Sequence, residues 1–152
     1  TMNATVNTWL SKSREELDEI YKKAKPGDIP TGDTQGTAIL AGSMFAKPVA
    51  FLVRLLVWQG KVFDLFGPKG ESGVLVNKMG PFGMKCIVAK VYREESWLDG
   101  KKTILIDYSK TSLVAKVIRD EIREVEPGVY LGKVWWGKKR ILDFALTRDI
   151  AS

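Results

Sequence analysis

The stretch Asp99-Gly100-Lys101-Lys102-Thr103-Ile104-Leu105-Ile106-Asp107-Tyr108 decides the fold class of this chain. Asp-Gly is a strong two-residue hairpin signal, and the β-branched run Thr103–Tyr108 behind it predicts a strand. The residues before the turn, Met84–Trp97, alternate between two faces and predict its partner. The stretch therefore predicts an antiparallel hairpin, and the same pattern continues on both sides of it.

From Lys61 onward, apolar residues repeat with a period of two and turn signals recur between the repeats. Glycine-rich turns separate the runs, and the further predicted strands are Lys61–Phe66, Gly73–Met79, Val129–Trp136 and Arg140–Thr147. About six antiparallel strands at regular spacing predict either a barrel or a strongly curved sheet. We prefer the barrel, which would enclose an interior.

Residues 110–125 interrupt this rhythm. Their apolar side chains, among them Leu113, Val117 and Ile118, repeat at three and four, which favours a helical crossover. An irregular strand over Ile118–Val125 is the alternative. The choice decides where the charged residues of this segment point.

The first part of the chain reads as helical. Thr5–Lys25 has one broad apolar face, and Ser11 or Ser13 can cap it, with Glu16 completing a capping box after Ser13. Met44–Trp58 is apolar on nearly all sides and predicts a helix that covers the sheet, or a lid that also meets a lipophilic ligand or a membrane surface. The expected fold is α+β and mainly β, a single domain over residues 1–152 in which a helical part, 1–60, covers an antiparallel lipocalin-like barrel or strongly curved sheet, 61–152.

Composition excludes several kinds of chemistry. The chain has 152 residues, no histidine and one cysteine, Cys86. A Ser–His–Asp or Cys–His mechanism, a zinc site rich in His or Cys, and an intramolecular disulfide framework all need residues that it lacks. No P-loop or dinucleotide-binding glycine pattern is present, so we expect neither a metal nor another cofactor.

The formal net charge is +6, yet Lys138-Lys139-Arg140 is the only purely basic cluster. Three charges in a hairpin tip are too few to indicate a nucleic-acid site. The most apolar segment, Met44–Trp58, contains Lys47, Pro48 and Arg54 and is too short to span a bilayer. We expect a soluble, cytoplasmic protein without a membrane span, and leave peripheral membrane contact and the oligomeric state open.

Several segments of the later half resemble one family of small domains. They are Asp99–Tyr108, Val117–Val125, Pro127–Lys133 and Phe144-Ala145-Leu146. Together they are similar to a lipocalin-like (calycin-like) family named after a GxWxG motif. At the place of that motif this chain has Gly36–Gly42, without the tryptophan. The resemblance implies a barrel with an apolar interior and a small lipophilic ligand, and it assigns no catalytic residue.

Candidate site residues lie at the ends of the predicted strands. Tyr108 shares a face with Ile104 and Ile106, so its hydroxyl is a candidate ligand contact inside the barrel. Asp107, beside it, is a candidate base at the barrel mouth. For both residues the alternative is a structural role, as a core aromatic and a strand-end turn former.

The densest charged cluster contains Arg119, Glu121 and Arg123. Regularly mixed charges most often form a salt-bridged exposed face. The functional alternative is that Arg119 or Arg123 turns inward and binds a ligand carboxylate at the barrel opening. Glu121 lies among apolar residues, so it is the best candidate for a buried carboxylate, which needs a partner or a proton.

Two functions from different classes follow. The leading hypothesis is a binding protein for a lipophilic small molecule, with Trp58, Tyr92, Tyr108 and Trp136 lining the pocket and Arg119 or Arg123 recognising a polar end. The alternative is a metal- and nucleotide-independent cyclase, isomerase or dehydratase in which Asp107, Tyr108 or Glu121 transfers protons. A third interpretation is an interaction module that binds acidic surfaces through Lys138–Arg140.

Overall fold

The computed structural model describes residues 3–39, 58–66, 72–79, 84–108 and 117–148. Two short helices, α1 (Ala4–Trp9) and α2 (Arg14–Lys23), precede the strands of one antiparallel sheet. The strands are β1 (Gly32–Asp33), β2 (Gln35–Ile39), β3 (Trp58–Phe66), β4 (Ser72–Met79), β5 (Met84–Glu95), β6 (Lys102–Asp107), β7 (Ile118–Glu126), β8 (Val129–Trp136) and β9 (Lys139–Thr147).

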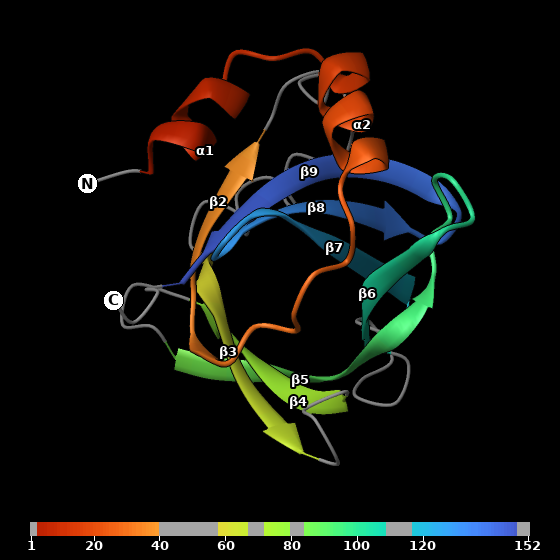
Figure 1. Cartoon of the computed structure of the whole chain (residues 1–152). Helices are drawn as coiled ribbons and strands as arrows, with labels where there is room; N and C mark the ends of the chain where they lie inside the picture. Colours follow the sequence, from red (N-terminus) through yellow and green to blue (C-terminus); the bar gives the residue numbers. More distant parts are fainter. Residues whose placement is uncertain (1–2, 40–57, 67–71, 80–83, 109–116, 149–152) are drawn as a thin grey trace.

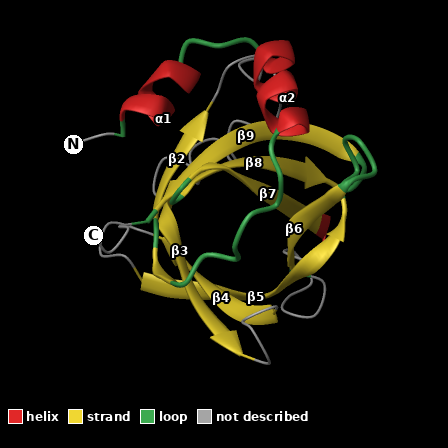
Figure 2. Ribbon diagram, in the orientation of Figure 1, coloured by secondary structure: helices red, strands yellow, loops and turns green. Residues whose placement is uncertain are grey.

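The sheet is strongly curved (Figures 1 and 2). Its strand order is β1-β3-β4-β5-β6-β7-β8-β9-β2, so β1 and β2 stand at opposite ends of the order. Along the chain, however, these two strands are separated by Thr34 alone. One segment therefore pairs first with β3 and then with β9. Because no hydrogen-bonded pairing joins β1 to β2 in the described strands, the ladder is a strongly curved sheet and not a closed barrel.

The predicted hairpins are present. The turn after β5 has Gly100 at a positive φ, and β5 pairs with β6 in the register Tyr92↔Leu105. The last two strands of the chain, β8 and β9, pair across a turn containing Gly137. The Asp-Gly and glycine-rich turn signals therefore predicted these two hairpin connections correctly.

The preference for a helix over residues 110–125 is wrong for the part that the structure describes. β7 pairs with β6 (Leu105↔Glu121) and with β8 (Glu121↔Lys133). Two neighbouring strands supply backbone partners along this segment, and tertiary pairing overrides its helical apolar period. The strand alternative, Ile118–Val125, matches β7 closely.

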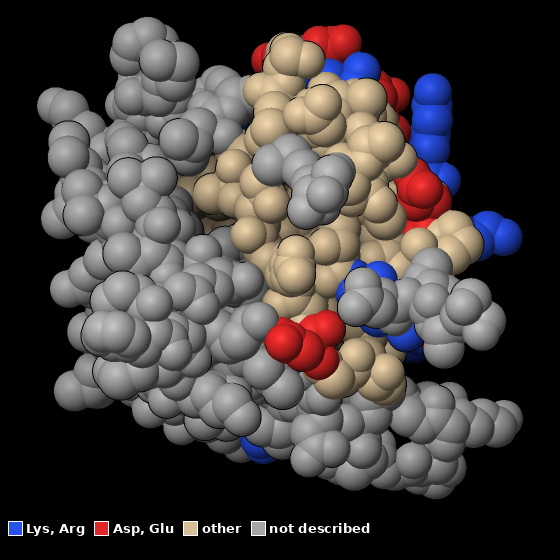
Figure 3. Space-filling model, turned by 90° about the vertical axis from the view of Figure 1, so that its left-hand side faces the viewer, with Lys and Arg blue, Asp and Glu red and all other residues tan. Residues whose placement is uncertain are grey.

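The amino-terminal helix is divided. α1 ends at Trp9, and α2 begins after Ser13, which accepts a hydrogen bond from the Glu16 backbone while the Glu16 carboxylate accepts one from the Ser13 backbone. This capping box, one of the two predicted starts, begins a new helix rather than continuing the first. Figure 3 shows the side that carries α1 and β2, where uncharged residues fill the centre of the described surface, since neither element contains a charged residue.

The first sixty residues are not only helical. β1, β2 and the start of β3 belong to the sheet, and Trp58 opens β3. The predicted helix Met44–Trp58 otherwise lies outside the described residues.

The two faces of the sheet bury separate apolar clusters. Against the outer face, α1 and α2 pack Val6, Trp9, Leu17 and Tyr21 onto residues of β2, β8 and β9. The concave face holds the interior cluster of Ile29, Ala89, Val91, Ile104, Ile106, Tyr108, Ile122, Tyr130, Val134, Ile141, Leu142, Phe144 and Leu146. Both faces of β6 to β9 are therefore covered, which explains why consecutive residues are buried in the central part of each of these strands.

Candidate functional site

A polar pair lies within the interior cluster. The Tyr108 hydroxyl donates to Oδ2 of Asp120 at 3.0 Å, and both residues are buried, with 3% and 5% of their surface exposed. Asp120 reaches this face because β7 alternates, so Ile118, Asp120 and Ile122 point inward together. A phenol and a carboxylate thus meet among apolar side chains.

One end of the interior is crossed by a strap, defined here as residues 24–31 between α2 and β1 (Figure 1). Its Ile29 is 4% exposed and belongs to the interior cluster. The Asp28 carbonyl accepts a hydrogen bond from the Tyr130 hydroxyl, and Glu124 accepts one from the Asp28 backbone at 3.0 Å. The strap therefore inserts the Ile29 side chain into the interior cluster from outside the sheet.

The turn at Gly27 requires glycine. Its φ is +72°, and a Cβ at this position would lie 2.3 Å from Cβ of Glu124. The Gly27 carbonyl also accepts a hydrogen bond from Arg93 at 2.7 Å. The positive φ and the close approach together fix the path of the strap onto β7.

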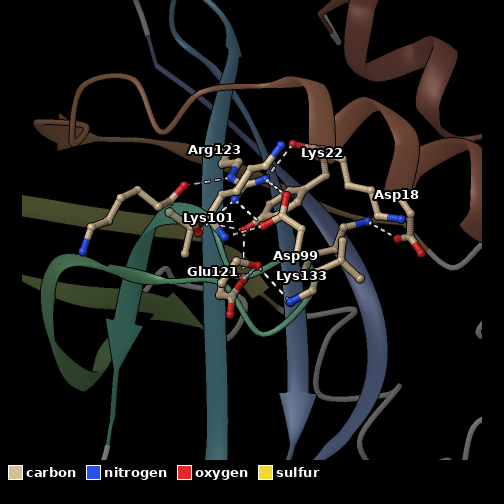
Figure 4. A network of polar contacts seen from close by, with 12 residues as sticks. Asp18, Lys22, Asp99, Lys101, Glu121, Arg123 and Lys133 are labelled. Atoms are coloured by element: carbon tan, nitrogen blue, oxygen red, sulfur yellow. Dashed lines mark hydrogen bonds and ion pairs between the residues drawn. The ribbon is translucent and has the colours of Figure 1, made fainter.

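The outer face carries a row of buried charged residues under α2. Glu121, Lys133 and Asp143 occupy paired positions on β7, β8 and β9. All three are less than 5% exposed. Figure 4 shows how Asp18 of α2 and the loop after β5 complete this network.

Glu121 accepts four hydrogen bonds. The Tyr21 hydroxyl and Ser96 Oγ donate to Oε1 at 2.9 and 2.6 Å, while the Trp97 backbone and Arg119 Nε donate to Oε2 at 2.8 and 2.9 Å. Burial raises the pKa of Tyr21, and the neighbouring Glu121 charge raises it further, which keeps this phenol protonated as a donor. Glu121 is therefore the buried carboxylate that the sequence predicts, and these four donors are its partners.

Arg123 is enclosed on the same face. Its Nη1 and Nη2 each donate to one carboxylate oxygen of Asp99 at 2.7 Å, and Nη1 donates to the Tyr21 carbonyl at 3.0 Å. The guanidinium also lies 4.4 Å from the centre of the Tyr21 ring. This hydrogen bonding from Arg123 lowers the pKa of Asp99.

Lys133 is completely buried between two carboxylates. Its Nζ donates to Asp18 at 2.8 Å and to Asp143 at 2.7 Å. Nη1 and Nη2 of Arg140 each donate to one carboxylate oxygen of Asp18 at 2.7 Å. Burial raises the pKa of Asp143 despite Lys133, whereas the hydrogen bonds from Arg140 and Lys133 lower the pKa of Asp18 against the opposing effect of burial.

The predicted site residues divide between the two faces. Tyr108 belongs to the interior cluster, but Glu121, Arg119 and Arg123 belong to the helix-covered face and do not turn inward. The reason is the strand period: one residue along β7 separates Asp120 from Glu121, and hence the interior from the outer face. The expected carboxylate-binding arginine at the opening is therefore not assembled from these residues.

Tyr92 and Asp107 lie together on the outer side. The Tyr92 hydroxyl donates to Oδ2 of Asp107 at 2.7 Å, and burial together with this bond raises the pKa of Tyr92 to about 12. Trp136 is 39% exposed at the end of β8. Trp58 of β3 pairs through its backbone with Met79 of β4, and the Trp58 side chain is outside the described part. Of the predicted pocket residues that the structure describes, Tyr108 is buried in the interior cluster, whereas Trp136 pairs with the inward-facing Ile118 but is exposed at the strand end.

Sequence reasoning missed Asp120 and Ile29. Alternation along a strand would have placed Asp120 beside Ile118 and Ile122, but only once that segment was read as a strand. No local pattern marks Ile29, because a loop residue enters the core through the path of the chain.

The three residues of the basic cluster Lys138–Arg140 do not share one environment. Lys138 and Lys139 are exposed, whereas Arg140 is paired with Asp18. Among the described residues, no three His, Cys, Asp or Glu side chains are grouped to hold a metal ion. Nor does any described helix have the length and apolarity to cross a membrane.

The chain matches no family model and no curated protein. Among solved structures, a protein from Thermomonospora curvata is similar, with a TM-score of 0.63 at 20% sequence identity. The match covers 97% of this chain and 95% of that chain. At this identity the similarity concerns the fold alone, and it supports the mainly antiparallel architecture.

Proposed function

We propose that the protein binds a lipophilic small molecule on the concave face of its curved sheet. The observation that carries this proposal is the Tyr108–Asp120 pair within the interior cluster. Apolar surroundings with a few placed polar groups are typical of small-molecule sites, because the apolar surface supplies affinity and the polar groups fix orientation. The resemblance to the lipocalin-like GxWxG family points to the same ligand class.

The polar pair restricts the ligand's polar end. Because the Tyr108 hydroxyl donates its proton to Asp120, the Tyr108 oxygen and the Asp120 carboxylate can each accept a hydrogen bond from a ligand hydroxyl. A free carboxylate would face Asp120 and be repelled. Neutral oxygenated lipids, such as sterols, terpenoid alcohols and long-chain alcohols, therefore fit the pair better than fatty-acid anions.

The first test is native mass spectrometry of the purified protein, followed by organic extraction and tryptophan-fluorescence titration with sterols, terpenoid alcohols, long-chain alcohols and fatty acids. We expect a co-purified apolar molecule or a saturable fluorescence change with a neutral probe. A clean apo mass together with no fluorescence change across the panel would remove the proposal.

The sequence offers a matched pair of variants. Tyr108→Phe and Tyr92→Phe each delete a phenol that donates to an aspartate, one on the concave face and one on the outer face. Loss of a single hydrogen bond to the ligand weakens binding by about tenfold. We expect that loss for Tyr108→Phe and unchanged affinity for Tyr92→Phe. Equal effects from both variants would contradict a ligand at Tyr108.

An enzyme acting on such a molecule is the second candidate. A phenol hydrogen-bonded to a carboxylate can relay a proton, which an isomerase, cyclase or dehydratase without metal or nucleotide requires. Within this alternative, Tyr108 and Asp120 replace Asp107 and Glu121, which belong to the other face. Incubation of each bound probe followed by product analysis separates the two functions: turnover that Asp120→Asn abolishes favours the enzyme, and unchanged probes favour the binding protein.

A further inference from the structure

The strap is placed to define the length of the proposed interior site. It is not a strand of the sheet, yet its Ile29 is 4% exposed within the interior cluster. The strap passes across one end of the curved sheet (Figure 1), and its Ile29 side chain packs with the interior cluster. An apolar side chain at the end of an apolar site limits how far a ligand can extend.

The strap is held by contacts that do not involve the Ile29 side chain. Oε1 of Glu124 accepts a hydrogen bond from the Asp28 backbone N–H at 3.0 Å, and Oε2 accepts one from the Gly128 backbone N–H at 2.9 Å. The Glu124 backbone in turn donates to the Pro26 carbonyl at 3.0 Å. Together with the Arg93 and Tyr130 hydrogen bonds, these contacts fix the backbone, so the residue at position 29 can change while the strap keeps its path.

The Tyr108–Asp120 pair lies further along β7, the strand whose Glu124 holds the strap. On β7, Asp120 and Glu124 are four residues apart, a separation of about 13 Å in an extended strand. The Tyr108–Asp120 pair and the strap thus stand at different levels of the interior. A ligand whose polar end contacts the pair directs its apolar end toward one end of the sheet or the other, and the strap closes one of them.

We propose that Ile29 is a specificity-determining residue of the interior site, which sets the maximum chain length of a long-chain alcohol bound with its hydroxyl at Tyr108 and Asp120. This inference rests on the proposed binding function. It adds a distinct claim, namely that the strap side chain and not a strand residue forms the end of the site.

The experiment measures affinity for a homologous series of saturated primary alcohols, from medium to long chains, by competition with a fluorescent lipid probe. The variants are Ile29→Ala, which removes about three carbon atoms, and Ile29→Phe, which adds volume. We expect the preferred chain length to increase by about two to three carbons in Ile29→Ala and to decrease in Ile29→Phe. Each added methylene that becomes buried is worth about a three- to fourfold gain in affinity.

Ile39→Ala is the matched control. Ile39 is also fully buried, but it belongs to the outer cluster beneath the helices. The control therefore creates a comparable cavity on the other face, and we expect its chain-length preference to equal that of the unaltered protein. Where Ile29→Ala fails to fold, Ile29→Val, which removes one methyl group, repeats the test with a smaller shift.

The outcomes separate the two claims. If the unaltered protein binds the series and the Ile29 variants keep its chain-length preference, the role of Ile29 is overturned and the binding function stands. A shift of equal size in Ile39→Ala also overturns it, because the effect would then follow from stability alone. If the unaltered protein binds no neutral lipid of the panel, the proposed function fails and the inference falls with it.

Discussion

The guanidinium of Arg123 and the carboxylate of Asp99 form a bidentate pair, with both nitrogen–oxygen distances at 2.7 Å. Arg123 is 1% exposed, so this partner and three backbone carbonyls replace the water that would otherwise solvate its charge. The pair joins the turn before β6 to the centre of β7, and the Tyr21 carbonyl adds the end of α2. One side chain therefore connects three elements that are distant in the sequence.

Removing Asp99 leaves a buried cation without its counter-charge. We expect Asp99→Ala to lower the free energy of unfolding by about 3–5 kcal/mol, the usual cost of breaking a buried pair from one side. Urea unfolding followed by tryptophan fluorescence measures it. Glu19→Ala is the control, since the exposed Glu19–Lys22 pair contributes less than about 1 kcal/mol. A loss below about 1 kcal/mol for Asp99→Ala would contradict the buried role of the pair.

Lys133 offers a test of whether the outer network is needed for stability or for specificity. Lys133→Met removes the cation that donates a hydrogen bond to the buried Asp143, and we expect a loss of about 3–5 kcal/mol. The double variant Lys133→Met/Asp143→Leu removes both charges, and we expect most of that stability to return. Urea unfolding of both variants gives the coupling. A double variant as unstable as the single one would show that the pair itself, and not its one-sided loss, stabilises the fold.

The aspartates of the network predict opposite responses to acid. The pKa of Asp99 is lowered below its ordinary 3.8 by Arg123, so its stabilising contribution is complete above that value and is lost as the pH falls through the folded-state pKa. Burial raises the pKa of Asp143 above 3.8, so the folded state takes up that proton first, and this residue makes unfolding less favourable as the pH falls through its folded-state pKa.

Unfolding free energies between pH 6 and about pH 2 test this difference. The stability gap between the unaltered protein and Asp99→Asn should narrow at the acid end. For Asp143→Asn, the stability of the unaltered protein relative to the variant should instead rise as the pH falls toward 3.8. Parallel curves for the two variants would contradict the assigned shifts.

A side chain added at Gly132 would overpack the concave face. A Cβ at this position would lie 2.2 Å from the Phe144 ring. Phe144 is 2% exposed in the interior cluster and has little room to move. We expect Gly132→Ala to cost about 1–3 kcal/mol through overpacking. Adding Phe144→Leu should recover part of that loss, which a double-mutant cycle measures; strictly additive losses would rule out the steric cause.

The sequence predicted local features well and the assignment of faces poorly. Asp99-Gly100, the Ser13–Glu16 capping box and the last hairpin depend on neighbouring residues, so their signals are readable from the chain alone. The role of Glu121 depends on Tyr21 and Ser96, which lie 100 and 25 residues away. Its burial was predictable from apolar neighbours, but its partners were not.

The segment around Arg119 shows why the site was placed differently. Its apolar residues repeat as in a helix, and two flanking strands nevertheless hold it extended. In a strand, adjacent residues face opposite sides, so one secondary-structure assignment moves every charged side chain of the segment. The clearest consequence concerns Asp120, which enters the interior beside Tyr108 while Arg119 and Glu121 leave it.

The segment Gly32–Ile39 pairs with β3 at its start and with β9 at its end. It therefore covers the outer hydrogen-bonding edges of two strands that are remote in the sequence. Unpaired strand edges are templates for association between molecules. Detachment of this single short segment would bare two such edges at once, so we expect aggregation, and not a soluble partly folded monomer, to follow its loss.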